Sequence, residues 1–292
     1  MAPAAAVDRE ARRRAWWLCA PALALFLALM VVPLVMTFVL SFHSFGFYTG
    51  IEPTFGLHNY LDVLGDSYFH EIFARTFGIA LVTTLLCAAI GTPEAYILYR
   101  MRSRWRSALL LVVIGPLLIS VVVRTLGWAI LMGNRGVINT ALMNLELIDR
   151  PIKMMYTPGG IVIALVHVMV PFMVIAVWAA LHRQDPATEQ AAESLGAGPL
   201  TIFFRVVLPQ AMPGVLSGSL IVFSLSASAF ATPAILGGRR VKVVSTTVYD
   251  EFLNTLNWPL GAAIAILLLV AVLLVMVSYN RVVERRFSQV FG

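Results

Sequence analysis

The chain is poor in charged residues, and this scarcity excludes most soluble folds. Asp, Glu, Lys and Arg make up 12% of the 292 residues, whereas soluble domains carry roughly 25% charged residues. Apolar residues account for 60% of the chain, and no long polar block interrupts them. Because no room is left for a separate soluble catalytic domain, we predict one membrane domain with short loops.

Cysteine and the signatures of enzyme sites are also scarce. The two cysteines, Cys19 and Cys87, lie inside apolar stretches without ligand-type neighbours, so we expect neither a disulfide framework nor a metal site. The histidines are scattered and no nucleophile–base pair stands out, so we expect no catalytic residue. The Gly-x-x-x-x-Gly-Lys-Ser/Thr nucleotide loop is missing, so we expect no cofactor and no ATP hydrolysis by this chain itself.

Long apolar runs dominate what is present. A membrane-spanning helix needs roughly 20 mostly apolar residues. Six stretches qualify, at about 16–42, 72–98, 107–132, 160–181, 213–236 and 258–280. The first is too long for the core of a signal peptide and no A-x-A cleavage site follows it, so we interpret it as an uncleaved span. The predicted fold is an all-α membrane protein with about six transmembrane helices.

The positive residues predict the orientation of these spans. Thirteen of the 21 Lys and Arg residues lie in the tails 1–15 and 281–292 and in the loops on the same side, against six in the opposite loops. Because short cytoplasmic loops are enriched in Lys and Arg, both termini are predicted to be cytoplasmic. The net charge of +6 is thus mainly a topology signal, and we expect no nucleic acid partner.

The longer of the two predicted cytoplasmic connections, 182–212, carries clear helix signals. Asp185 is a good N-cap and Pro186 suits the first helical position, so a short helix is expected to end near residue 195. Gly196 can adopt the left-handed conformation that ends such a helix. The connection is therefore predicted to begin as a short helix closed by a glycine turn outside the membrane.

A second short helix is expected from Pro199, with Pro209 as its stop. Apolar side chains recur at helical spacing in both halves of this hairpin: Ala187, Ala191 and Leu195, then Leu200, Phe203, Phe204 and Val207. A compact knob of this kind suits docking into a groove of a partner protein. The alternative is an amphipathic hairpin that rests on the bilayer surface.

The hairpin resembles the EAA loop of ABC importer permeases, whose pattern is E-A-A, three residues, Gly, nine residues, Ile-x-Leu-Pro. The corresponding residues here are Gln190-Ala191-Ala192, then Gly196, then Val206-Val207-Leu208-Pro209, with the same spacing throughout. In that family the loop is a coupling helix that fits a cleft on the ATP-binding subunit. The resemblance implies these ATPase-coupling residues: Glu189, Gln190, Ala191, Ala192, Gly196, Leu208 and Pro209.

Gln190 departs from the family pattern, because it occupies the position of the usual glutamate. That glutamate is thought to pair with a basic residue of the ATPase. Glu189 is adjacent but points about 100° away on a helix. Three alternatives stay open: Glu189 takes over the role, Gln190 makes a neutral hydrogen bond, or the contact is weaker.

Three further runs resemble the spermidine/putrescine-type permeases. They are Pro116 to Arg124-Thr125-x-x-Trp128 followed by Gly136-x-x-Asn139, then Phe230-Ala-Thr232-Pro233-Ala-Ile-Leu-Gly-Gly238, and Asn257-Trp-Pro-Leu-Gly-Ala-Ala263. The resemblance implies the type I importer fold in a bacterial inner membrane and transport of a polyamine. The implied partners are a second homologous permease, two ATP-binding subunits and a periplasmic substrate-binding protein.

Other functions remain as alternatives. The same importer group includes permeases for other small organic solutes. An ion-coupled secondary transporter would be expected to show paired repeats and broken helices at matching positions. An intramembrane enzyme would need a reactive pair within its spans, and none stands out.

Candidate path residues follow from polar groups in apolar runs, because an ionisable residue inside a span is a functional hypothesis by default. Glu94, in the second span, is a candidate cation contact, and the alternative is a helix-end carboxylate paired with Arg100 or Arg102. The fifth span offers Ser224, Ser226, Phe230 and Thr232 as path lining, with ordinary helix packing as the rival. Arg124 and Trp128 are candidates for an outer gate or a contact with the delivering protein.

Overall fold

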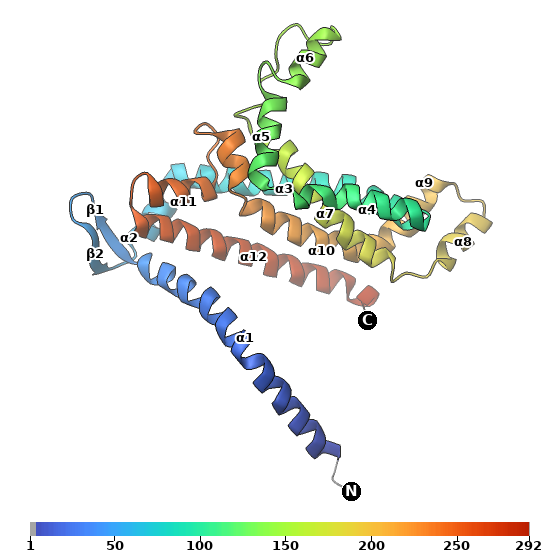
Figure 1. Ribbon diagram of the computed structural model, residues 1–292, viewed down its shortest axis with the longest axis horizontal. Coiled ribbons are helices and arrows are strands. Elements are labelled where there is room, and N and C mark those ends of the chain that lie inside the picture. Colours follow the sequence, from blue (N-terminus) through green and yellow to red (C-terminus); the bar gives the residue numbers. More distant parts are fainter. Residues whose placement is uncertain (1–3, 292) are drawn as a thin grey trace. The chain divides into compact units, whose positions relative to one another are not determined.

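The computed structural model describes residues 4–291 of the chain, and side chains between 16 and 283 (Figure 1). It is mostly helical, which confirms the predicted fold class. Six segments are long and apolar enough to cross a membrane: Trp16–Leu40, Ser67–Arg100, Val121–Asn144, Pro158–Leu181, Pro199–Ala227 and Trp258–Val283. The chain divides into two compact units, 1–65 with 250–267 and 66–249 with 268–292, and each is described separately.

The first unit contains a β-hairpin that the sequence did not predict. Within residues 1–65, this unit contains α1 (Ala4–Leu40), the two strands of the hairpin, β1 (His43–Gly46) and β2 (Gly50–Phe55), and α2 (His58–Gly65). The two strands are antiparallel, and the ring of Phe42 stacks on Phe55 at the base of the hairpin. Asn59 donates hydrogen bonds to the carbonyls of Ser41 and His43, at 2.9 and 2.8 Å, so α2 is fixed to the end of α1.

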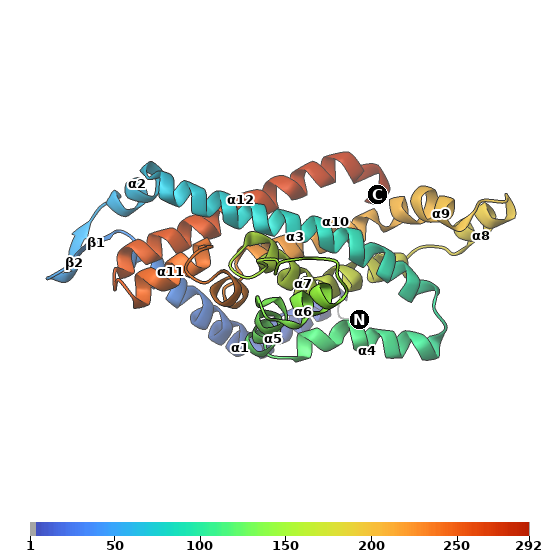
Figure 2. The ribbon, with the colours of Figure 1, turned by 90° about the horizontal axis from the view of Figure 1, so that it is seen from above.

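The second unit is built around three helices that pack side by side: α3 (Ser67–Arg100), α7 (Pro158–Leu181) and α10 (Leu208–Ala227) (Figure 2). Small residues permit this close packing. A Cβ atom added to Gly214 would lie 2.7 Å from the Cβ of Ala180, and one added to Gly218 would lie 2.7 Å from the sulfur of Met173. Small residues at such contacts let membrane helices approach closely, so α7 becomes the buried centre of the unit.

The predicted third span, 107–132, is two helices rather than one. These are α4 (Ser103–Leu118) and α5 (Val121–Met132), separated by Ile119 in extended conformation and by Ser120, which is not helical. α5 turns away from the direction of α4 and α7, and α6 (Val137–Asn144) follows it (Figures 1 and 2). The break has a physical reason: Arg124 donates from its guanidinium to the carbonyl of Pro116, a group that the ended helix leaves without a partner.

The predicted fifth span, 213–236, also begins and ends at other residues in the structure. A continuous helical path runs through α9 (Pro199–Ile202), a π-helical segment (Phe203–Val207) and α10, so Pro209 does not end a helix as expected. The wider π turn precedes Pro209 and accommodates the missing N–H and the bulk of its ring. The helix instead ends at Ala227, and a second π-helical segment, Pro233–Gly237, follows the break.

The remaining helices are α8 (Ala187–Ser194), α11 (Val244–Leu253) and α12 (Trp258–Phe291). The predicted tails are largely helical extensions of spans, since α1 begins at Ala4 and α12 continues to Phe291. Residues 1–3 and 292, also part of those predicted tails, lie outside the described residues. In the second unit, α3, α10 and the segment after residue 267 share a small core around Ala80, Ala227 and Val272.

Candidate functional site

The hairpin 185–209 lies between α7 and α10, with α8 and α9 beyond the last turns of the three-helix core (Figures 1 and 2). The structure places the N-cap at Pro186, not at Asp185 as predicted, so the helix starts at Ala187, one residue later than expected. The carboxylate of Asp185 accepts a hydrogen bond of 2.9 Å from the backbone N–H of Ala187. Gly196 has φ +80°, the left-handed conformation predicted for it. The N–H of Ala197 then returns to the carbonyl of Ala192 at 3.1 Å and closes the turn.

The tip of this hairpin carries exposed neutral and apolar side chains. Gln190 and Ala191 are exposed on α8. At the turn and on the second half, Leu195, Leu200 and Phe204 are 88%, 73% and 60% exposed. Such large apolar side chains at the tip of a polar connection indicate a surface that is covered in the working protein.

The predicted apolar stripe of the second half therefore divides between two sides. Leu200 and Phe204 point outward, whereas Phe203 lies against the ring of Tyr96 with 5.4 Å between centroids, and Val207 is buried. Three of these four residues lie in the π-helical segment Phe203–Val207, so the α-helical spacing assumed for the stripe does not hold there. Leu208 is half-buried and Pro209 is exposed in the first turn of α10.

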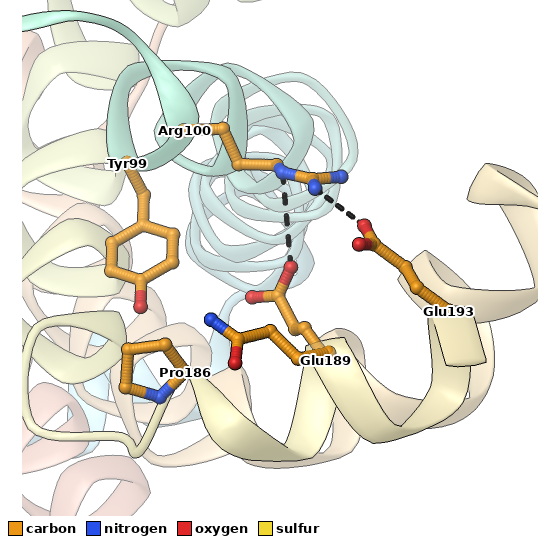
Figure 3. A pocket seen from close by; sticks show the side chains of 6 residues that line it. Tyr99, Arg100, Pro186, Glu189 and Glu193 are labelled. Atoms are coloured by element: carbon orange, nitrogen blue, oxygen red, sulfur yellow. Dashed lines mark hydrogen bonds and ion pairs between the residues drawn. The ribbon is translucent and has the colours of Figure 1, made fainter.

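The acidic side chains of α8 point toward α3 (Figure 3). Arg100, the last residue of α3, lies with its Nη2 atom 2.6 Å from the carboxylate of Glu193 and with its Nε atom 3.9 Å from that of Glu189. The hydroxyl of Tyr96 donates to Glu189 at 3.0 Å and accepts from Arg100 at 3.1 Å. Ala192, on the same side of α8, packs against the core. We call Tyr96, Arg100, Glu189 and Glu193 the α3–α8 cluster.

Gln190 does not join this cluster's ion pairs. Its side chain lines the same shallow pocket as Tyr99 and Pro186 but remains exposed (Figure 3). On the other edge of α8, the amide of Gln210 donates to the hydroxyl of Thr188 at 3.1 Å, which ties α8 to α10. The position predicted for coupling thus carries an exposed neutral side chain, while the neighbouring carboxylate of Glu189 is bonded within the chain.

Glu94 lies in α3, one residue after Pro93, and is half-buried. Arg100, one of the two partners expected for it, instead contacts Glu189 and Glu193. Arg102 is exposed at the N-terminus of α4. Within residues 16–283, no ion pair involves Glu94.

The candidates in the fifth span lie at its break. Ser226 is buried with no hydrogen-bond partner for its hydroxyl, and Ser224 accepts a 2.9 Å hydrogen bond at its carbonyl from the hydroxyl of Ser228. Phe230 is 39% exposed and its ring lies 4.9 Å from that of Tyr249, itself 46% exposed. Thr232 is buried, with its hydroxyl 3.3 Å from that of Thr125 in α5.

Arg124 and Trp128 do not form one exposed site. Arg124 is 8% exposed and its guanidinium binds the Pro116 carbonyl across the break. Trp128 donates from its indole nitrogen to Nδ1 of His167 at 3.1 Å, which joins α5 to α7. The observed contacts of both residues hold broken or neighbouring helices together, and the gate role stays a prediction.

Sequence reasoning missed Tyr96 and Arg100 as parts of the hairpin site, and Tyr249 as a partner of Phe230. The sequence suggests Arg100 only as a positive charge in a short loop and as a possible partner of Glu94. Its acidic partners lie about 90 residues away in the sequence, so no local pattern joins them. The i, i+4 spacing of Glu189 and Glu193 was the available signal, because it places both carboxylates on one face of a helix.

Comparisons with known proteins agree with this architecture. Residues 4–289 match the family described as binding-protein-dependent transport system inner membrane component. The spermidine/putrescine transport system permease protein PotB of Escherichia coli is 32% identical over 231 residues, which cover 79% of this chain and 84% of that protein.

Two solved structures share the fold. One is a bacterial ABC transporter involved in the import of the acidic polysaccharide alginate, with a TM-score of 0.78, 19% identity and coverage of 94% of this chain and 98% of that one. The other is the alginate transporter in complex with its alginate pentasaccharide-bound periplasmic protein, with a TM-score of 0.77, 20% identity and coverage of 95% and 97%. The chain therefore belongs to the binding-protein-dependent transport system inner membrane components, the permease subunits of ABC importers.

Proposed function

We propose that the hairpin 185–209 is the surface to which an ATP-binding subunit docks, on the cytoplasmic side of the membrane. The observation that carries this proposal is the exposed apolar tip on a helix–Gly–helix turn, set directly between two core spans. A hairpin that rests on the bilayer would need a continuous apolar face along both helices, turned toward the membrane. Here they gather at the turn, at Leu195, Leu200 and Phe204, which suits insertion into a protein cleft.

The contact with the ATP-binding subunit is proposed to be uncharged at Gln190. Of the two carboxylates on α8, Glu189 is only 13% exposed, and Glu193, although 46% exposed, is already paired with Arg100, so both have a basic partner within the chain. Gln190 is the exposed residue at the coupling position and can donate and accept hydrogen bonds. Of the three alternatives considered for this position, these contacts favour a neutral hydrogen bond made by Gln190.

The solute is proposed to be a polyamine such as putrescine or spermidine. The named function of the E. coli relative supports this class, at 32% identity over most of both chains. Two features of this chain suit a flexible organic cation. Glu94 offers a half-buried carboxylate without an ion pair among the described residues, and Phe230 with Tyr249 offers adjacent exposed aromatic faces, which attract ammonium groups.

The proposed assembly contains this chain, a second homologous permease, two ATP-binding subunits and a periplasmic substrate-binding protein in the inner membrane, with both termini of this chain cytoplasmic. ATP binding closes the ATPase pair and moves the docked hairpin. α7 and α10 leave the two ends of the hairpin, so its motion passes directly into the centre of the helix core. The broken third and fifth spans, which meet at Thr125 and Thr232, then alternate between two arrangements around the solute path.

Co-purification tests the coupling surface. Tagged protein is expressed with its genomic neighbours, extracted in detergent and analysed for an ATP-binding subunit. Wild type is expected to retain that subunit, whereas Leu200→Glu with Phe204→Glu is expected to lose it while remaining monodisperse. Thr201→Glu, exposed on the same short helix, is the matched control and is expected to retain the subunit. Absence of any ATPase from the functional wild-type complex contradicts the proposal.

Uptake by the reconstituted importer tests the solute. Proteoliposomes that contain the complete complex and its binding protein are supplied with labelled putrescine and ATP. Accumulation that requires ATP and is competed by spermidine is expected. Accumulation of other small organic solutes without any competition by polyamines contradicts the polyamine assignment but leaves the permease function intact.

A further inference from the structure

We infer that Arg100 is a positioning residue that fastens the coupling hairpin to the second span, α3. This inference rests on the proposed coupling role of the hairpin. It extends that role, because the hairpin is joined through the chain only to α7 and α10. The α3–α8 cluster adds a third connection, from the middle of the coupling helix to the end of a span that is far away in sequence.

In the α3–α8 cluster, the guanidinium of Arg100 lies between the carboxylates of Glu189 and Glu193 (Figure 3). Arg100 binds Glu193 at 2.6 Å through Nη2 and approaches Glu189 at 3.9 Å through Nε. Tyr96, one turn earlier on α3, donates to Glu189 and accepts from Arg100 through the same hydroxyl oxygen. The four side chains therefore form one connected network rather than separate ion pairs, and such networks hold a fixed geometry better than single exposed pairs.

The surroundings of the cluster favour a mechanical role. Glu189 is sheltered, and the ring of Tyr96 packs against Phe203 in the π-helical segment that leads into α10. α3 itself packs along α7 and α10 through most of its length. A displacement of α8 by a docked subunit is therefore passed through Arg100 to α3 at the same time as it reaches α7 and α10.

Without the α3–α8 cluster, α8 keeps its chain connections and the hydrogen bond between Thr188 and Gln210. The coupling helix remains able to bind a partner but can tilt relative to α3. The expected defect is therefore one of transmission: ATP is hydrolysed while less solute is moved. Loss of the hairpin surface itself would instead remove the ATP-binding subunit.

The test uses the complete importer in proteoliposomes with its binding protein, ATP and labelled putrescine. Arg100→Gln is expected to retain the ATP-binding subunit and to lower the putrescine moved per ATP by about three- to tenfold. Tyr96→Phe keeps the ring contact with Phe203 and is expected to give a smaller loss of the same kind. Arg104→Gln, which removes an exposed arginine four residues further along in the first turn of α4, is the matched control and is expected to behave as wild type.

A charge exchange separates transmission from a general loss of structure. In the double variant Arg100→Glu with Glu193→Arg, the arginine introduced on α8 can reach the carboxylate introduced at the end of α3 and also Glu189 one turn away on α8. Transport per ATP is therefore expected to recover in the double variant, whereas each single exchange is expected to remain defective. Equal transport per ATP in wild type, Arg100→Gln and Arg104→Gln overturns the inference, and so does an exchange that fails to recover while the complex stays assembled.

These outcomes differ from failure of the proposed function. If wild type carries no ATP-binding subunit, the coupling role itself is wrong. If wild type does not accumulate putrescine, only the solute is wrong. The stimulation of ATP hydrolysis by the binding protein then replaces transport per ATP as the measure, and Arg100→Gln is expected to lower that stimulation relative to Arg104→Gln.

Discussion

Gly196 shows how one residue sets the shape of the hairpin 185–209, whose coupling role is proposed above. Its φ of +80° is accessible to glycine, and a β-branched residue there costs about 1–3 kcal/mol. We predict that Gly196→Val disfavours the closed turn by roughly five- to 140-fold and lowers ATP-driven uptake accordingly, while membrane insertion is unchanged. Uptake and the amount of protein in the membrane fraction are measured together.

Gly198 provides the control for that substitution. It lies two residues further along with φ −70°, and a Cβ atom added there meets nothing within 4 Å. Gly198→Ala is therefore expected to transport as wild type. Equal uptake by Gly196→Val and Gly198→Ala would show that the left-handed turn is not needed for coupling.

Glu94 tests the electrostatics of the solute path. We predict that Glu94→Gln, which keeps the size of the side chain and removes its charge, lowers putrescine uptake at subsaturating concentration by about tenfold, the effect of losing roughly 1.4 kcal/mol of attraction. Glu71→Gln, an exposed carboxylate in the first turns of the same helix, serves as control. An unchanged concentration dependence for Glu94→Gln would assign this residue to packing instead.

At the scale of elements, the break between α4 and α5 depends on Arg124. Its guanidinium binds the Pro116 carbonyl and its side chain is buried. Loss of a hydrogen bond from a charged donor costs about 1.5–3 kcal/mol, so we predict that Arg124→Met lowers the melting temperature of the detergent-solubilised protein measurably. Val123→Met, at a neighbouring side chain that is 62% exposed, is expected to leave it unchanged.

The same pair of variants discriminates between the two roles considered for Arg124. If Arg124→Met melts as wild type but loses uptake or association with the binding protein, the outer-gate hypothesis is favoured over a structural role. Thermal unfolding followed by tryptophan fluorescence and uptake in proteoliposomes are the two measurements. A normal result in both would leave no role for the contact with Pro116.

The helices and their breaks also show which parts of the fold can be predicted from the sequence. Hydrophobic run lengths predict six apolar segments, and local signals at Asp185 and Gly196 predict the coupling turn, because both depend on nearby residues. The break at Ile119 could not be predicted, since a membrane helix tolerates a residue such as Pro116 in many contexts. The path of the helix through Pro209 depends on the π turn before it, which has no comparable sequence signal.

At the scale of the whole molecule, the chain leaves much of its apolar surface uncovered. None of the most apolar 18-residue window of α1 is buried, compared with 61% for the corresponding window of α7. A helix that is apolar all round and exposed must be covered by lipid or by another chain. The membrane domain is therefore predictable from composition. The α3–α8 cluster is not, because it depends on contacts between segments that are distant in the sequence. The partners that cover the exposed surface cannot be predicted from a local pattern either.

The distribution of charge on the hairpin 185–209 leads to a prediction about assembly. The carboxylates of α8 are engaged by Arg100, and the surface proposed to bind the ATP-binding subunit contains the exposed residues Gln190, Ala191, Leu200 and Phe204. Between 0.15 and 1 M salt the screening length falls from about 8 to about 3 Å, which weakens exposed ion pairs but not apolar contacts. We predict that the amount of ATP-binding subunit retained on immobilised permease changes less than about twofold over this range.

Substitution at the coupling position makes that prediction specific. Gln190→Glu restores the carboxylate of the family pattern and is expected to make retention depend on salt, because a charge is then exposed at the contact. Ser194→Ala, exposed on the same helix without a change of charge, is expected to match wild type. Release of most of the ATP-binding subunit from wild type at 1 M salt would mean that charged groups outside α8 carry the docking, and the neutral contact at Gln190 would then be wrong.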